Sequence, residues 1–177
     1  IDKGATPSFL GYQGFPASSC ISVNDVVVHG IPSEDIILQE GDIVSIDVGV
    51  LYQGYNGDAA RTFPVGKISK EKQKLIDVTK QSFFEGISNL KVGEKLGKLS
   101  NAIQKYAESF GYSVVRELVG HGIGKNMHEA PNVPNYGKET DGITIPENIL
   151  LAVEPMINMG RREIYIEHDG WTIRTQD

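Results

Sequence analysis

The sequence predicts an α+β fold in which an antiparallel sheet is covered by helices. Residues 43–50 alternate apolar and polar side chains with a period of two, which is typical of a β-strand. Residues 69–90 and 94–110 instead carry apolar side chains at helical spacing. No low-complexity linker separates these segments, so all 177 residues are expected to form one domain.

The expected elements follow one another along the chain with recognisable boundaries. Residues 9–31 are expected to form a glycine-rich loop followed by a strand pattern, and residues 57–63 a strand that forms a hairpin with 43–50. The first helix is expected to have its N-cap at Ser69, and the second to end at Gly111. Further strands are expected at residues 112–119, 149–154 and 163–168.

The hairpin raises the question of how Asp47 and Asp58 lie relative to each other. A turn centred on Tyr52-Gln53 makes them a direct cross-strand pair, in which like charges are destabilising unless a cation lies between them. A turn at Asn56-Gly57, the stronger two-residue turn signal, separates them. Small neighbours leave room for an ion beside the aspartates: Ser45, Gly49 and Ala60.

Composition excludes several classes of function. The net charge of −6 and the pI near 5.2 argue against binding to nucleic acid or to an anionic membrane. No apolar run approaches the roughly 18 residues of a spanning helix. Cys20 is the single cysteine, which rules out a disulfide framework and favours a reducing, cytoplasmic compartment.

The two ends of the chain suggest a piece of a longer protein. The sequence begins at Ile1 instead of a methionine, and it ends at Asp177 directly after a segment that reads as a strand. We therefore expect the chain to be cut at both ends.

A second carboxylate-bearing strand is expected around Glu154, which lies in the apolar run ILLAVEPMI. A buried glutamate is almost always paired or bound to a metal. His121 lies between two glycines, so the backbone there can approach an ion or a substrate closely. The segments 29–31 and 121–123 both read His-Gly-Ile and both precede a strand with one carboxylate. This echo indicates a two-fold repeated fold, although chance similarity of such short strings is the alternative.

One histidine with several carboxylates is an oxygen-rich ligand set. It suits Mn, Fe, Co or Mg, with Zn as a further candidate, and does not suit a structural thiolate site. Two ions that share bridging oxygens can clamp the attacking and leaving oxygens of a hydrolysis. The pattern therefore indicates a metal-assisted hydrolase.

Four segments carry a specific resemblance to a known family. They are GYQGFPASSCISVNDVVVHGIP, GDIVSIDVGVLYQGYNGDAARTF, GHGIGKNMHEAPNVPNYG and AVEPMI with DGWTIRTQD. In their order and intervals they resemble the type I methionine aminopeptidases, over nearly the whole chain. The resemblance implies a pita-bread fold with two pseudo-symmetric halves around a dinuclear metal site, and a hairpin register with facing aspartates.

The resemblance also implies a role for each matching residue. Asp47 is expected to chelate one metal, Asp58 to bridge both, and His121 and Glu154 to bind the other. Glu154 is the expected proton acceptor, His128 the residue that stabilises the oxyanion, and His29 a contact to the substrate backbone. The expected walls of the methionine pocket are Phe9, Tyr12, Phe15, Cys20 and Trp171.

Cofactors, partners and alternatives follow from the same resemblance. The cofactors are expected to be two divalent ions among Co, Mn, Fe and Zn. The expected partner is the N-terminal methionine of nascent or short peptides. The protein is expected to be a cytoplasmic monomer, and association with the ribosome is left open. A fifth, bridging glutamate of the family lies beyond the tryptophan, whereas Glu167-His168 precedes Trp171, and the N-terminal helices of the family are not matched. The alternatives are a pita-bread peptidase that cleaves before proline and a non-catalytic binding module.

Overall fold

The computed structural model describes residues 3–177, so the expectation that rests on Ile1 lies outside it. The chain divides into two compact units. The first comprises the chain up to residue 73 with residues 124–127 and 164–176, and the second comprises residues 74–123 and 128–163 with Asp177. Each unit therefore contains one of the two His-Gly-Ile segments.

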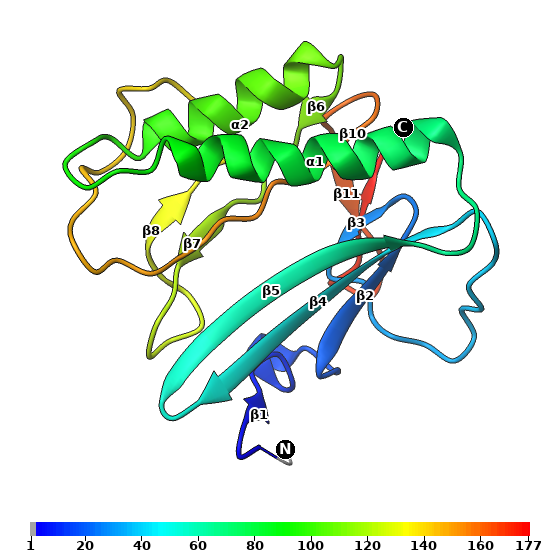
Figure 1. The fold of residues 1–177 in the computed structure, drawn as a ribbon. Helices are drawn as coiled ribbons and strands as arrows, with labels where there is room; N and C mark the ends of the chain where they lie inside the picture. The colour runs from blue at the N-terminus through cyan, green and yellow to red at the C-terminus, as the bar shows by residue number, and fades with distance from the viewer. Residues whose placement is uncertain (1–2) are drawn as a thin grey trace. The chain divides into compact units, whose positions relative to one another are not determined.

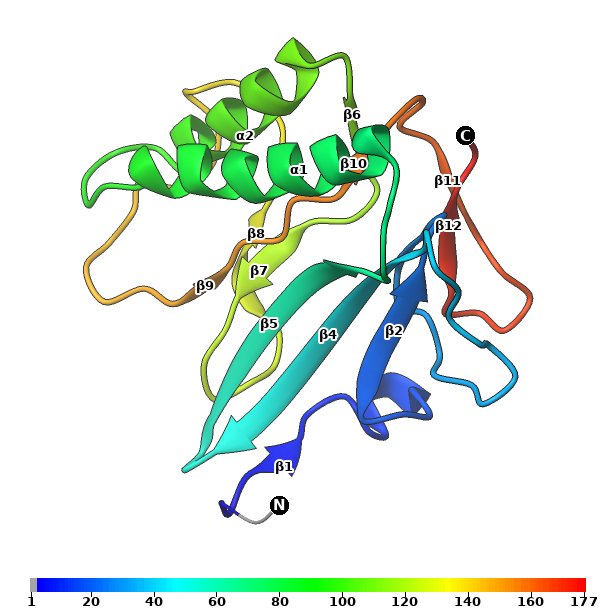
Figure 2. The ribbon, with the colours of Figure 1, turned by 45° about the vertical axis from the view of Figure 1, so that its right-hand side comes forward.

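The first unit is built on a long antiparallel hairpin of β4 and β5, with β2 on the other side of β4 (Figures 1 and 2). A short β1 also pairs with β4, and a second small sheet has the order β11-β12-β3. The elements are β1 Thr6–Pro7, the 3-10 helix η1 Tyr12–Gly14, β2 Ser19–Val23, β3 Val26–Val28, β4 Ile43–Tyr52, β5 Tyr55–Pro64, β11 Ile164–Ile166 and β12 Ile173–Thr175.

The two faces of β4 alternate as the sequence predicts, and the predicted hairpin strands are confirmed with slightly longer bounds. The apolar face is the more open one, since Ile46, Val48 and Val50 are 36–43% exposed. The face with Asp47 is more covered, because Gly49 on it is buried. The carboxylate therefore does not lie on the solvent side of its strand.

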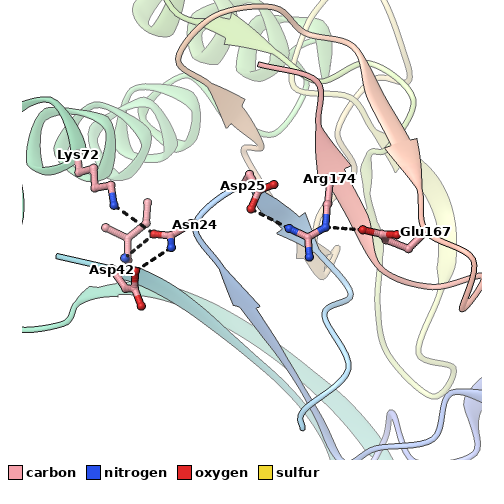
Figure 3. A network of polar contacts seen from close by, with 7 residues as sticks. Asn24, Asp25, Asp42, Lys72, Glu167 and Arg174 are labelled. Atoms are coloured by element: carbon pink, nitrogen blue, oxygen red, sulfur yellow. Dashed lines mark hydrogen bonds and ion pairs between the residues drawn. The ribbon is translucent and has the colours of Figure 1, made fainter. Parts of the chain in front are cut away.

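The strand pattern predicted before residue 31 divides into β2 and β3. The chain turns between them at Asn24, whose φ is 52°. The Asn24 side chain donates to Oδ1 of Asp42 at 2.8 Å and accepts a hydrogen bond from Nζ of Lys72 at 3.2 Å (Figure 3). The hydrogen bond from Asn24, with one from the Gln39 backbone, holds the pKa of Asp42 below its usual value. This network ties the turn to the start of β4 and to the start of the first helix.

The second unit contains most of both predicted helices. α1 Lys70–Ser88 follows Ser69, whose hydroxyl accepts a hydrogen bond from the Lys72 N–H at 3.2 Å, so the predicted N-cap is confirmed. α2 Gly97–Ser109 ends before Gly111, which has a φ of 82°. Of the described residues, no helix is both long and apolar enough to cross a membrane.

A three-stranded sheet of order β8-β7-β9 and a pair of β10 with β6 complete the second unit. The strands are β6 Ser113–Val114, β7 Gly120–Gly122, β8 Glu129–Val133, β9 Leu151–Ala152 and β10 Ile157–Asn158. The continuous strand predicted at 112–119 is wrong beyond Val114. There the Glu117 carboxylate accepts the Arg116 N–H at 3.1 Å, and such local bonds compete with a sheet ladder.

The core of the second unit joins α2 to its sheet. The ribbon views show α2 and α1 lying over the side of β7 and β8 (Figures 1 and 2). Leu99 and Ile103 of α2 are fully buried and cluster with Val133 of β8. α1 packs beside α2 at Gly86, where a Cβ would lie 2.6 Å from Cγ1 of Ile103. The predicted cover of a sheet by helices is therefore present in this unit.

We expect Gly86→Val to destabilise the protein by about 1–3 kcal/mol, because the added methyl groups overpack the contact with Ile103 while the change in helix propensity is small. The free energy of unfolding in urea measures the effect. Lys80→Val, at an exposed position of the same helix, is the control and should change it by about 0.5 kcal/mol or less. Equal effects of the two variants would contradict the close approach of α1 and α2.

Candidate active site

The hairpin β4–β5 closes through a two-residue turn at Gln53 and Gly54, since Tyr52 pairs directly with Tyr55. The φ angles of Gln53 and Gly54 are 49° and 83°. Positive φ at both central residues defines the type I′ turn, whose twist suits a hairpin. A turn centred on Tyr52-Gln53 and a turn at Asn56-Gly57 are therefore both wrong, because glutamine, which rarely adopts positive φ, takes it here.

Asp47 and Asp58 share one face of the hairpin, but they do not lie directly opposite each other. Asp47 pairs with Ala60, and Asp58 pairs with Gly49. The predicted direct pair is therefore wrong, since the turn lies one residue further along than that pair requires. The two aspartates are diagonal neighbours, at a spacing of about 7–8 Å between Cα atoms. This spacing leaves room for an ion between the carboxylates.

Cys20 approaches the same aspartates from the neighbouring strand. β2 pairs Cys20 with Asp47, and the cysteine is only 4% exposed. Burial, and then the negative charges of Asp47 and Asp58, raise the pKa of Cys20 to about 12. The thiol therefore stays protonated at neutral pH, and the donor atoms that this face offers to a cation are carboxylate oxygens.

The aspartate face is closed at one end by Phe9. A Cβ at Gly49 would overlap the Phe9 ring, so the ring lies directly on the backbone of β4. Oδ1 of Asp47 is buried on this face. A carboxylate oxygen that is withdrawn from water needs a compensating cation or hydrogen bond. The Asp47 carboxylate has the chemistry of an oxygen donor for a divalent cation.

In the second unit, His121 lies at the centre of β7 between two glycines that the sheet requires. A Cβ at Gly120 would overlap the carbonyl oxygen of Ala152 on β9, and one at Gly122 would overlap that of Ala130 on β8. The sequence predicts that an ion or a substrate approaches the backbone at these glycines. In the structure, the groups that approach closely are the backbones of the neighbouring strands. His121 is therefore held in a three-stranded sheet, 6% exposed.

The two ring nitrogens of His121 have different partners. Nδ1 lies 2.8 Å from the carbonyl oxygen of Gly122, which can only accept, so Nδ1 carries the hydrogen. Nε2 lies 3.2 Å from Oε1 of Glu154, an ion-pair distance without hydrogen-bond geometry. A neutral Nε2 and a carboxylate oxygen are both acceptors, and two acceptors face each other stably only with a cation, either a proton or a metal ion, between them. The pair therefore fits a divalent metal.

The main chain at Glu154 is fixed by a residue that the sequence does not single out. Asn135 is fully buried, and its side-chain amide donates to the backbone carbonyl of Glu154 at 2.7 Å. An asparagine after a proline reads as a loop residue, so its burial is the signal that only the structure supplies. Asn135 holds the strand end from which Glu154 reaches His121.

An open cavity of about 570 Å³ adjoins His121 in the second unit. His128 is exposed on its wall, and the centroids of the His128 and His121 rings are 4.0 Å apart. The lining residues are Val119, Gly120, His121, His128, Glu129, Ala130 and Asn132. A group bound here can reach both imidazoles.

Two predicted pocket residues, Phe15 and Trp171, lie with His29, the predicted substrate-backbone contact, in the first unit. The Trp171 ring stands edge-on to Phe15, with centroids 5.2 Å apart, and edge-on to His29, with centroids 6.4 Å apart. His29 has a φ of 59° and precedes Gly30, whose N–H donates to the Ser22 hydroxyl at 3.1 Å. Tyr12 lies half-buried in η1. The structure thus groups Phe15, His29 and Trp171, and it places Phe9 and Cys20 with the aspartates.

Comparison with known proteins identifies the relatives of the chain. The model of metallopeptidase family M24 matches residues 2–177. The methionine aminopeptidase of Clostridium acetobutylicum is 54% identical over 173 residues, which cover 98% of this chain and 69% of the relative. The crystal structure of methionine aminopeptidase from Thermotoga maritima superposes with a TM-score of 0.96 at 43% identity and covers 98% of this chain and 70% of that one. The predicted pita-bread α+β fold is confirmed.

A prolidase, which represents the alternative of cleavage before proline, is a more distant relative. The prolidase from Pyrococcus horikoshii has a TM-score of 0.67 at 28% identity, over 77% of this chain and 39% of its own. The likeness is lower in identity, in coverage and in structural agreement than that to methionine aminopeptidase. The comparisons therefore favour methionine aminopeptidase over a peptidase that cleaves before proline.

We expect the stability that Cys20 contributes to fall as pH rises above about 9. Its pKa is raised to about 12 from the ordinary 9.0, so above pH 9 the unfolded chain releases a proton that the folded chain keeps. Unfolding in urea should show the wild type losing about 1 kcal/mol more than Cys20→Ala between pH 8 and pH 10. Parallel losses in the two proteins would contradict the buried, protonated thiol.

Proposed function

Since the chain belongs to metallopeptidase family M24 and, within it, to the methionine aminopeptidases, we propose that it removes the N-terminal methionine of polypeptides by metal-assisted hydrolysis. The observation that carries this proposal is the 54% identity to a methionine aminopeptidase over 98% of the chain. The chain is thus an enzyme and a metal-dependent hydrolase.

The metal ligands are proposed to be Asp47, Asp58, His121 and Glu154. Two observations support the assignment: the Nε2–Oε1 contact of 3.2 Å between His121 and Glu154, and the buried Oδ1 of Asp47. Asp47 would bind one divalent ion, His121 and Glu154 the other, and Asp58 both. The ligand set favours Co, Mn, Fe or Zn. When bound, such ions acidify water and stabilise negative charge on oxygen.

The protein's own groups divide the remaining work. Glu154 would accept the proton of the attacking water. His128 would donate a hydrogen bond to the scissile carbonyl oxygen, whose charge grows in the transition state. The exposed imidazole beside the 570 Å³ cavity supports that role. His29 would contact the substrate backbone near the nitrogen of its second residue.

The methionine side chain is proposed to bind among aromatic rings and a thiol. Such a surface suits a flexible thioether, because sulfur makes favourable contacts with aromatic rings. The edge-on contacts of Trp171 with Phe15 and His29 support a preformed wall. The proposed lining is Phe9, Tyr12, Phe15, Cys20 and Trp171.

The cellular setting follows from the proposed substrate. A nascent chain is the main source of N-terminal methionine, so association with the ribosome is part of this proposal. The acidic net charge of −6 and the lone buried Cys20 support action in the cytoplasm without direct nucleic-acid binding. We propose that the protein acts there as a monomer.

The function is tested by offering Met-Gly-Met and an Ala-Pro peptide to the complete protein with Mn²⁺ or Co²⁺. Release of free methionine, with little cleavage of the Ala-Pro bond, is the expected result. Preferred cleavage before proline would support the prolidase alternative. Neither product, together with no bound metal, would support a non-catalytic module.

His128→Ala should lower kcat by roughly 10²–10³ while the metal content stays unchanged. The reason is that the variant loses a hydrogen-bond donor to the oxyanion but loses no metal ligand. Steady-state kinetics and elemental analysis measure the two quantities. His168→Ala, at an exposed histidine in the turn between β11 and β12, is the matched control and should change neither. A loss of metal from the His128 variant would make that residue a ligand and overturn the assignment.

The metal assignment predicts different stoichiometries for single ligand variants. His121→Ala and Asp47→Asn should each retain one of two ions, and Asp58→Asn should weaken both, because only Asp58 is proposed to bridge. Elemental analysis after gel filtration gives the ratio of metal to protein. Asp35→Asn, at an exposed aspartate, should keep the wild-type ratio. Wild-type stoichiometry in His121→Ala would remove that residue from the site.

A further inference from the structure

The loop that carries Trp171 is organised by one carboxylate, that of Asp169. Oδ1 of Asp169 accepts two backbone hydrogen bonds, from the N–H groups of Trp171 and Thr172, each at 2.8 Å. Oδ2 accepts the Thr172 hydroxyl at 2.6 Å. Both carboxylate oxygens are therefore used within three residues, and they set the backbone direction at Trp171.

The same loop is closed at its base. The Glu167 N–H donates to the Thr172 carbonyl at 2.8 Å, and the Gly170 N–H donates to the Glu167 carbonyl at 3.0 Å. Gly170 has a φ of 76°, a conformation that an L-residue with a side chain rarely adopts. The six residues between β11 and β12 thus form one compact turn, and Trp171 lies near its end.

An arginine anchors this turn to the rest of the first unit. Arg174 on β12 contacts Oε1 of Glu167 through Nε at 2.5 Å and Oδ1 of Asp25 through Nη1 at 2.8 Å (Figure 3). Asp25 lies in the turn between β2 and β3, and β2 carries Cys20. The base of the loop is therefore held to the strands of the same unit, and Asp169 is the element that holds its tip.

The bonds at Asp169 are made to the ionised carboxylate. The hydrogen bond from the Thr172 hydroxyl, together with those from the backbone at Trp171 and Thr172, holds the pKa of Asp169 below its usual value. Asp169 is exposed, and it makes none of the ring contacts of the aromatic group. A substitution of Asp169 therefore removes no contact between the aromatic rings and no proposed catalytic group.

We propose that Asp169 is a positioning residue for substrate selectivity, which holds the Trp171 ring edge-on to Phe15 and His29 and so sets the shape of the methionine pocket. This inference rests on the proposed function, because that proposal assigns Trp171 to the pocket. An apolar pocket separates similar side chains by small differences in fit, so a ring that is free to turn loses discrimination before it loses activity.

Asp169→Ala removes all three acceptor contacts, whereas Asp169→Asn keeps Oδ1 for the two backbone N–H groups and presents an amide to the Thr172 hydroxyl. The test compares both variants of the complete protein, with Glu163→Gln as a control for the loss of one surface charge. Trp171 fluorescence is taken as the difference from Trp171→Phe in each background. The ratio of kcat/KM for Met-Gly-Met to that for Leu-Gly-Met measures selectivity.

We expect Asp169→Ala to shift the Trp171 emission to longer wavelength and to make it more open to quenching by acrylamide. The selectivity ratio should fall by about fivefold. Asp169→Asn should restore most of both, and Glu163→Gln should alter neither. Unfolding in urea checks that the variants remain folded.

Three results separate the possible failures. Unchanged fluorescence in Asp169→Ala would overturn the positioning role. Changed fluorescence with an unchanged ratio would overturn the role in selectivity and remove Trp171 from the methionine pocket. A wild-type protein that releases no methionine would instead refute the proposed function, whereas the fluorescence comparison would still report on Asp169.

Discussion

The contact of 3.2 Å between Nε2 of His121 and Oε1 of Glu154 is the constraint on which the site in the second unit depends. Nδ1 is committed to the Gly122 carbonyl, so Nε2 has no hydrogen to offer in the neutral ring. The pair therefore has the chemistry to hold a cation. The glycines on either side of His121 allow three strands to converge on it, and Asn135 fixes the main chain from which Glu154 reaches. Fold and site are thus coupled through a few backbone contacts.

The first unit meets a related requirement by different means. Asp47 and Asp58 share a face as diagonal neighbours, and their charges together with burial keep Cys20 protonated. Negative charge is thus concentrated on the more covered side of the hairpin, while apolar side chains occupy the open side. This reversal of the usual pattern places the two carboxylates that we propose as metal ligands on the covered face.

Much of this could be predicted from the sequence, because periodicity reports local structure. The strands around Asp47 and Asp58, the two helices and the Ser69 cap all follow from short-range patterns. The hairpin register could not be predicted, because it depends on positive φ at Gln53, against the preference of that residue. β8 was not expected either, since a central proline argues against a strand. The proposed ligand residues come from the family resemblance, because their spacing in the sequence does not bring them together. Asn135 and Asp169 were missed because most of their partners are backbone groups, which carry no sequence signal.

The most direct test of the central claim is a measurement of the ¹⁵N chemical shifts of the His121 imidazole by NMR, without metal and during titration with Zn²⁺. We expect Nδ1 to carry the proton throughout, and the Nε2 resonance to move as the metal binds, because Nε2 is the nitrogen that faces Glu154. The same titration of Glu154→Gln should require more Zn²⁺. A proton on Nε2 in the metal-bound protein, or a His121 ring that does not respond to Zn²⁺, would contradict the account.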